Sequence, residues 1–70
     1  MPKLYSSAHI LKVLGAHGFI TISQKGSHIK LRKTGDVTLT VIVPANKKEM
    51  PIGTFRSILR QSSLAEDEFK

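Results

Sequence analysis

The first apolar residues recur three to four positions apart, which is the spacing of one helix face: Ile10, Val13 and Leu14. Ser6 or Ser7 can cap the start of this helix, because a serine oxygen accepts hydrogen bonds from N–H groups that lack a partner in the first turn. We predict a helix from these serines to about His17. Gly18 can adopt the left-handed conformation that ends a helix, and in such a Schellman motif Phe19 would lie near Leu14.

From Phe19 the pattern changes to alternating and β-branched residues, which is typical of strands. We predict three strands, over residues 19–23, 28–32 and 37–43. Polar, glycine-containing turns separate them, and Pro44 closes the third. Because strands joined by such short turns pair side by side, we expect an antiparallel sheet.

Successive side chains point to opposite sides of a strand, so the middle strand divides its residues between two faces. Ile29 and Leu31 point to one side. His28, Lys30 and Arg32 point to the other side, so the histidine shares a face with two cations. We expect Ser or Thr side chains of the neighbouring strands beside them, in a register that does not follow from the sequence.

A polar loop over residues 45–49 leads to a second helix after Pro51. Its apolar stripe consists of Phe55, Ile58 and Leu59. Arg56 and Arg60 lie one turn apart on this helix. Beyond it, we expect Phe69 to anchor a short turn.

The order helix, three strands, helix predicts an α+β fold, with both helices on one face of a three-stranded antiparallel sheet. The other face stays open and carries the histidine and the cations of the middle strand. A chain of 70 residues suffices for one domain, which would span residues 1–70. Its stability should be modest, because so small a domain buries a small share of its surface.

Charge narrows the choice of partner. Eleven Lys and Arg stand against five Asp and Glu, and three of these acids lie together at residues 66–68. This excess favours a phosphate-rich partner such as RNA, although a merely solubilising cationic surface would carry the same charge. The sequence has no cysteine, no apolar run of the signal-peptide kind and no membrane span, so we expect a cytoplasmic protein that does not engage a membrane.

The available residues limit the chemistry that such a protein can perform on RNA. A two-metal nuclease needs clustered carboxylates, and outside residues 66–68 only Asp36 and Glu49 are present. We therefore expect no metal and no other cofactor. RNA supplies its own nucleophile, the 2′-hydroxyl, so its cleavage needs a base, an acid and positive charge near the reacting phosphate.

His28 is the candidate base or acid, because imidazole gains and loses a proton near neutral pH. The residues around it can contact the RNA backbone: Lys25, Gly26, Ser27, Lys30 and Arg32. An ordinary hairpin glycine followed by an exposed strand histidine would have the same Gly-Ser-His sequence. His9 and His17 fall on the first helix, and we interpret them as structural or surface residues.

Several motifs, taken together, resemble the HicA toxin family: Gly18-Phe19, Gln24-Lys25-Gly26-Ser27-His28, Pro44, Gly53-Thr54-Phe55-Arg56-Ser57-Ile58-Leu59-Arg60-Gln61 and Phe69. The resemblance implies a double-stranded-RNA-binding-domain-like α-β-β-β-α fold. It also implies the activity of an mRNA interferase, the toxin of a type II toxin–antitoxin module, which cleaves mRNA and is neutralised by a HicB antitoxin. The catalytic histidine of the family falls on His28.

The chain departs from the family pattern at two places. Many members carry a histidine shortly after the proline that closes the third strand, whereas this chain has Asn46. An amide can form hydrogen bonds but cannot carry a proton through neutral pH, so His28 would be the only catalytic group that titrates near neutrality. The second departure is Ser62-Ser63, where the family usually has Ala-Gly. Losing that glycine should weaken the helix stop without affecting the chemistry.

The leading hypothesis is thus a metal-independent endoribonuclease toxin in which His28 is general acid or base. The second hypothesis is a non-catalytic RNA-binding module on the same fold, which would recognise RNA by shape through the cationic face. A third is a protein-interaction domain whose basic helix face docks an acidic partner. By charge, Arg56 and Arg60 on that helix are also where a HicB-like antitoxin would bind.

Overall fold

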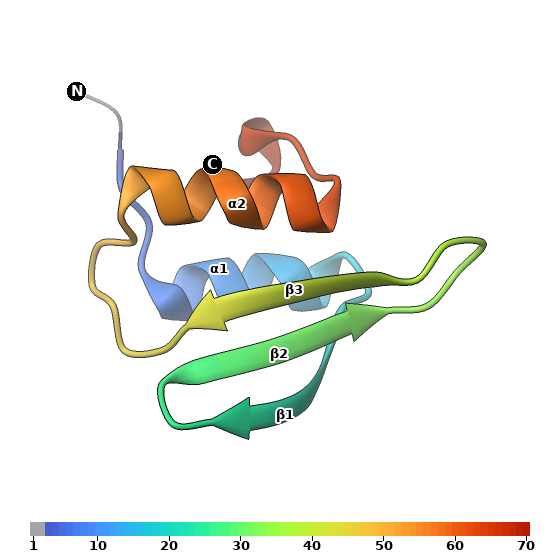
Figure 1. Ribbon diagram of the computed structural model, residues 1–70. Coiled ribbons are helices and arrows are strands. Elements are labelled where there is room, and N and C mark those ends of the chain that lie inside the picture. The colour runs from blue at the N-terminus through green and yellow to red at the C-terminus, as the bar shows by residue number, and fades with distance from the viewer. Residues whose placement is uncertain (1–2) are drawn as a thin grey trace.

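The first helix, α1, spans Ser7–Ala16 in the computed structural model, which describes residues 3–70 (Figure 1). The Oγ of Ser6 accepts a hydrogen bond from the N–H of His9 at 3.1 Å. This bond satisfies one of the N–H groups that have no partner inside the first turn. The prediction of a serine cap is confirmed, with Ser6 in that role.

The end of α1 confirms the predicted Schellman motif. The N–H of Phe19 donates to the carbonyl of Leu14 at 3.0 Å, and the N–H of Gly18 donates to the carbonyl of Gly15 at 3.1 Å. This pair of bonds requires a left-handed residue between helix and strand, and Gly18 supplies it with a φ of 95°. Phe19 enters the core directly after it.

The sheet has three antiparallel strands in the order β1-β2-β3, namely β1 (Ile20–Lys25), β2 (His28–Lys33) and β3 (Leu39–Pro44). The third strand begins two residues later than predicted, because Lys33 with Leu39 is the last pair that β2 offers. Val37, which the alternation places inside that strand, lies in the β2–β3 connection and is 70% exposed. Apolar alternation in a sequence therefore continues here beyond the paired strand.

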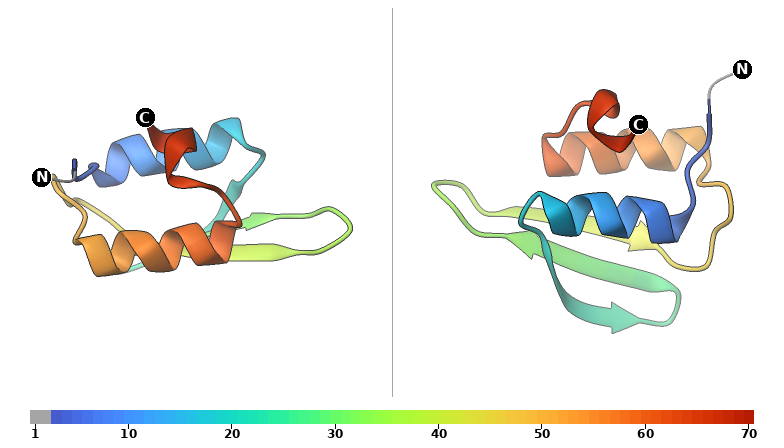
Figure 2. Two further views of the ribbon diagram at one scale, coloured as in Figure 1. Left: turned by 90° about the horizontal axis from the view of Figure 1, so that it is seen from above. Right: turned by 180° about the vertical axis from the view of Figure 1, so that it is seen from behind.

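The second helix, α2, spans Ile52–Ser62, and a short 3₁₀ helix, η1, follows at Glu66–Phe69. Both α1 and α2 lie on the same side of the sheet, as predicted (Figures 1 and 2). α2 runs along β3, where the Oε1 of Gln61 accepts the N–H of Ile42 at 2.9 Å. The side chain thus satisfies a donor that an edge strand would otherwise leave open.

The core lies between the sheet and the helices. Its buried residues are Tyr5, Ile10, Leu14, Phe19, Ile29, Leu31, Val41, Val43, Ala45, Met50, Phe55, Ile58 and Phe69. β1 contributes none of them, since all six of its residues are exposed and Ile20 is 66% exposed. No helix among residues 3–70 has the length and apolar character that crossing a membrane requires.

Candidate functional site

The open face of the sheet is the side that the helices leave uncovered. Strand pairing assigns to it Ile20, Ser23, Lys25, His28, Lys30, Arg32, Thr40, Ile42 and Pro44. The alternation predicted for β2 is confirmed, because Ile29 and Leu31 are buried while the intervening side chains are exposed. The structure thus brings together the site residues that were predicted on the middle strand.

A β-bulge in β1 decides which side chains accompany those of β2. The register shifts between Thr21 and Ser23, so Ile22 has no partner on β2. Ser23 then lies opposite Lys30, and Ile20 rather than Thr21 lies opposite Arg32. A bulge inserts one extra residue and changes the face of everything beyond it. The expected Ser and Thr neighbours are present as Ser23 and Thr40, together with two isoleucines that the sequence pattern does not reveal.

The turn before His28 is a two-residue hairpin loop, Gly26-Ser27, closed by the pair of Lys25 and His28. Gly26 has a φ of 58°, the left-handed conformation that such tight hairpin turns need. A Cβ at this position would meet no atom within 4 Å, so conformation rather than space calls for glycine. Directly opposed strand residues have Cβ atoms about 5 Å apart. Lys25 is therefore the nearest cation to His28 across the hairpin.

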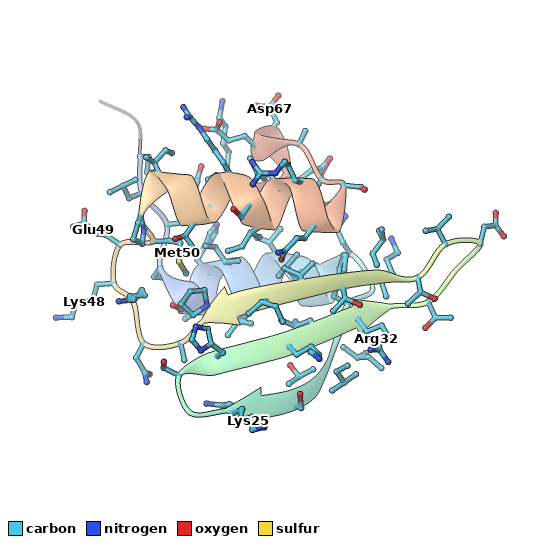
Figure 3. The ribbon with its side chains drawn as sticks, in the orientation of Figure 1. Lys25, Arg32, Lys48, Glu49, Met50 and Asp67 are labelled. Atoms are coloured by element: carbon cyan, nitrogen blue, oxygen red, sulfur yellow. The ribbon has the colours of Figure 1, made fainter. Side chains whose placement is uncertain are left out.

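The charged side chains of the open face are Lys25, Lys30 and Arg32, and all three are exposed cations. Figure 3 shows Lys25 and Arg32 near opposite ends of this face. The two ion pairs among residues 3–70 join His17 to Glu68 and Lys70 to Asp67. The three cations of the open face therefore remain free to bind a ligand. An elongated cationic surface with an imidazole at the hairpin end of its middle strand suits a polyanion.

The backbone that carries His28 is fixed from the side of β3. Its partner across the sheet is Pro44, and the next residue, Ala45, donates its N–H to the carbonyl of Ser27 at 2.7 Å. The Oγ of Ser7 in turn donates to the carbonyl of Pro44 at 2.7 Å. The hairpin turn, the end of β3 and the start of α1 are thereby linked, which holds the position of the imidazole while its ring stays exposed.

Behind the hairpin, on the helix side of the sheet, the structure forms a pocket of about 540 Å³. Its polar lining includes Gln24, Asn46, Lys47 and Lys48. Sequence reasoning missed this pocket, because Gln24 lies more than twenty residues from the other three. Asn46 has a left-handed φ of 62°, which is uncommon for a residue other than glycine. The sequence alone does not predict this conformation.

Arg56 and Arg60 lie on a different surface from His28. They are exposed on α2, on the helix side of the sheet, and the Nη2 of Arg60 donates to the Oγ of Ser57 at 3.0 Å. The structure therefore does not bring the helix arginines together with the open face. A partner that contacts both would have to reach around the edge of the sheet at β3.

His9 in α1 and His17 directly after this helix hold the C-terminal segment. The Nε2–H of His9 donates to the carbonyl of Phe69 at 2.6 Å, and the Nε2 of His17 lies 3.3 Å from a carboxylate oxygen of Glu68. Phe69 itself is fully buried and packs edge-on against Phe55, so the expected anchor is confirmed. Among residues 3–70, no three His, Cys, Asp or Glu side chains gather closely enough to share a metal ion.

Comparison with models of protein families matches residues 7–64, which is most of the chain, to the family described as "HicA toxin of bacterial toxin-antitoxin". The matched segment contains all three strands and both α-helices. None of the curated proteins matches the chain significantly.

Proposed function

Because the chain belongs to the HicA toxin family, we propose that it is an endoribonuclease toxin that cleaves mRNA in the cytoplasm and is neutralised by a HicB-like antitoxin. In this proposal residues 1–70 act as one domain, His28 is the general acid and base, and the open face binds the substrate. The observation that supports it most directly is the exposed imidazole at the hairpin end of a face whose charged groups are all cations.

The proposed reaction uses a nucleophile that is part of the RNA. A 2′-oxygen loses its proton to His28 and bonds to the adjacent phosphorus, and the bond from this phosphorus to the next 5′-oxygen breaks. The protonated imidazole then returns the proton to the leaving 5′-oxygen. The products are a 2′,3′-cyclic phosphate and a 5′-hydroxyl. Because the nucleophile needs no activated water, the reaction proceeds without a metal ion.

The cations of the open face stabilise the charge that develops on the phosphate. Lys25 lies across the hairpin from His28, and Lys30 lies two residues further along the same strand, about 7 Å away. Arg32 continues the row and would bind a neighbouring phosphate, where its planar fork suits two oxygens at once. Ser27 offers a hydroxyl donor, and the unobstructed backbone at Gly26 allows a close approach by the RNA.

A non-catalytic RNA-binding module is the second candidate function. The observation that favours it is the single imidazole of the open face, since the position where many relatives carry a second histidine holds Asn46. One group would then have to serve as both base and acid. This reading predicts RNA binding without strand cleavage.

The two functions are separated by incubating purified protein with a defined RNA in excess chelator. We expect fragments with 2′,3′-cyclic phosphate and 5′-hydroxyl ends from the wild type and at least a hundredfold slower cleavage by His28→Ala, in line with the loss of an acid–base group. His17→Ala is the matched control, because it removes a histidine that lies outside the open face.

Intact RNA in the wild-type reaction would reject the nuclease proposal and leave the binding module. Fragments with 5′-phosphate ends would reject the 2′-hydroxyl mechanism. Unchanged cleavage by His28→Ala would support a nuclease activity in which His28 has no catalytic role.

A further inference from the structure

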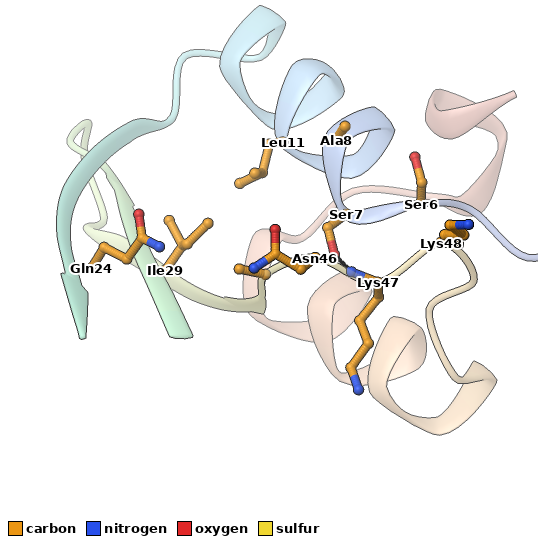
Figure 4. Close-up of a pocket in the computed structure, with 10 residues that line it drawn as sticks. Ser6, Ser7, Ala8, Leu11, Gln24, Ile29, Asn46, Lys47 and Lys48 are labelled. Carbon is orange, nitrogen blue, oxygen red and sulfur yellow. Dashed lines mark hydrogen bonds between the residues drawn. The ribbon is translucent and has the colours of Figure 1, made fainter. Parts of the chain in front are cut away.

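The pocket behind the hairpin is a surface that the proposed chemistry does not use. It lies between α1, the end of the β1–β2 hairpin and the loop that leaves β3 (Figure 4). Its apolar lining comes from Ala8 and Leu11 of α1, Ile29 of β2 and Ala45, which follows β3. Figure 4 shows the amides of Gln24 and Asn46 on either side of Ile29. The pocket thus combines an apolar base with amide groups at its sides.

Hydrogen bonds hold the Asn46 wall of this pocket in place before any ligand arrives. The Ser7 Oγ, on a residue that is 4% exposed, donates to the carbonyl of Pro44 and accepts the N–H of Lys47 at 2.9 Å. The N–H of Ser7 donates to the carbonyl of Lys47 at 2.8 Å. Asn46 lies between these anchored residues, so its left-handed backbone is fixed. A preformed pocket avoids the entropic cost of ordering a loop on binding.

We propose that this pocket binds one unpaired nucleobase of the RNA substrate, with the apolar wall against the ring and the amides of Gln24 and Asn46 on its hydrogen-bonding edge. This inference rests on the proposed function. An amide presents both a donor and an acceptor, as the edges of bases do. Unstacked bases of single-stranded RNA are recognised through such ring contacts and edge hydrogen bonds. The volume lies within the usual range of small-ligand sites.

The charge at the rim of the pocket is complementary to the phosphates of a nucleic acid. The charged side chains that line the pocket are Lys47 and Lys48, both exposed. They can bind the phosphates on either side of the inserted base.

The pocket and the open face share the same end of the sheet. Ile29 follows His28 in β2, and Gln24 precedes Lys25 in β1, so each pair places one side chain on each face. An RNA strand that passes over the turn at Ser27 reaches both faces. The pocket is thereby placed to select the nucleotide next to the bond that His28 cleaves.

The test measures binding of short single-stranded oligoribonucleotides to His28→Ala, which avoids cleavage. One base at a time is replaced by an abasic site. We expect one position at which the loss of the base weakens binding by roughly tenfold, as base contacts of this kind do. The same abasic site should have no added effect in a Gln24→Ala/Asn46→Gly variant, because coupling between two changes reports direct contact.

The variants are chosen so that the backbone of the pocket is preserved. Asn46→Gly removes the amide but keeps the left-handed backbone without strain. Thr21→Ala is the matched control, since Thr21 lies on β1 outside the pocket lining. Cleavage of the unmodified RNA by the wild type is measured separately, so a failure of the proposed function is seen independently of the pocket.

Equal effects of abasic sites at every position, or an undiminished abasic effect in the double variant, would overturn the proposal. Absence of oligonucleotide binding would overturn it as well. A loss of antitoxin binding in the double variant, without any loss of base coupling, would assign the pocket to a protein segment instead.

Discussion

The hydroxyl of Ser7 offers a direct test of how the site is held together. It is buried and bonds to two backbone groups that lie 37 and 40 residues away in the sequence, the carbonyl of Pro44 and the N–H of Lys47. Ser7→Ala removes both hydrogen bonds and only one heavy atom. The change therefore separates the contribution of the hydroxyl from that of packing.

The expected loss follows from the burial of the two groups that are left unpaired. A buried polar group that loses its partner costs about 1–3 kcal/mol. The side chain of Lys47 is exposed and Pro44 is half-buried, so water reaches part of this region and the lower end of the range applies to each. We expect Ser7→Ala to lower the free energy of unfolding by about 2 kcal/mol. For a domain of this size, that corresponds to a Tm lower by roughly 10 °C.

Urea unfolding followed by circular dichroism measures this loss, with the slope of the transition unchanged if only stability is affected. Ser57→Ala is the control, because its hydroxyl is partly exposed and its two hydrogen bonds, with the carbonyl of Gly53 and with Arg60, both stay within α2. It should change stability by less than about 0.5 kcal/mol. Equal effects of the two substitutions would refute the reasoning that the Ser7 hydroxyl anchors the loop.

Four further predictions concern other parts of the molecule. Ser63→Gly should raise the free energy of unfolding by about 1 kcal/mol in urea, because Ser63 ends α2 with a left-handed φ of 60°. Phe69→Ala should lower it by about 3–5 kcal/mol, since the ring is fully buried, and calorimetry should show the loss. Glu68→Gln should change the Tm by only a few degrees, because its pairing with His17 is half exposed. Lys30→Ala should weaken RNA binding at every sequence and lower the slope of log Kd against log salt by about 0.7, measured by fluorescence anisotropy.

The parts of the fold that could be predicted are those that neighbouring residues determine. The stop of α1 depends on Leu14, Gly18 and Phe19, which lie within one segment of the chain. The division of β2 into an open and a covered side depends only on alternation. Ser63 follows the same logic, since its left-handed conformation occupies the place where a glycine is usual.

The parts that could not be predicted depend on contacts between distant segments. The start of β3 is set by where β2 ends, so Val37 falls outside the sheet although the alternation includes it. The bulge at Ile22 shifts the pairing of β1 without any glycine or proline to mark it. The exposure of all of β1 depends on how far the helices reach across the sheet, which no local pattern encodes.

The candidate site divides in the same way. His28 and the cations of β2 could be placed from sequence, because one strand carries them. The pocket could not, because Gln24 and Asn46 come to the same pocket only when β1 and β3 pair on the two sides of β2. Ser7 was a plausible helix cap from its position, yet the structure gives the cap to Ser6 and uses the Ser7 hydroxyl for this tertiary link.

The backbone hydrogen bond between the hairpin turn and the end of β3 supports both the open face and the pocket. The bond from Ala45 to Ser27 joins the loop of the pocket to the turn that carries His28. A substitution that loosens the loop, such as Ser7→Ala, should therefore slow cleavage and weaken base selection together. Substitutions of the pocket amides alone should change which nucleotide is preferred and leave the acid–base step intact, because His28 points to the opposite side of the sheet. The two kinds of variant thus distinguish the residues that hold the site in place from the residues that select the nucleotide.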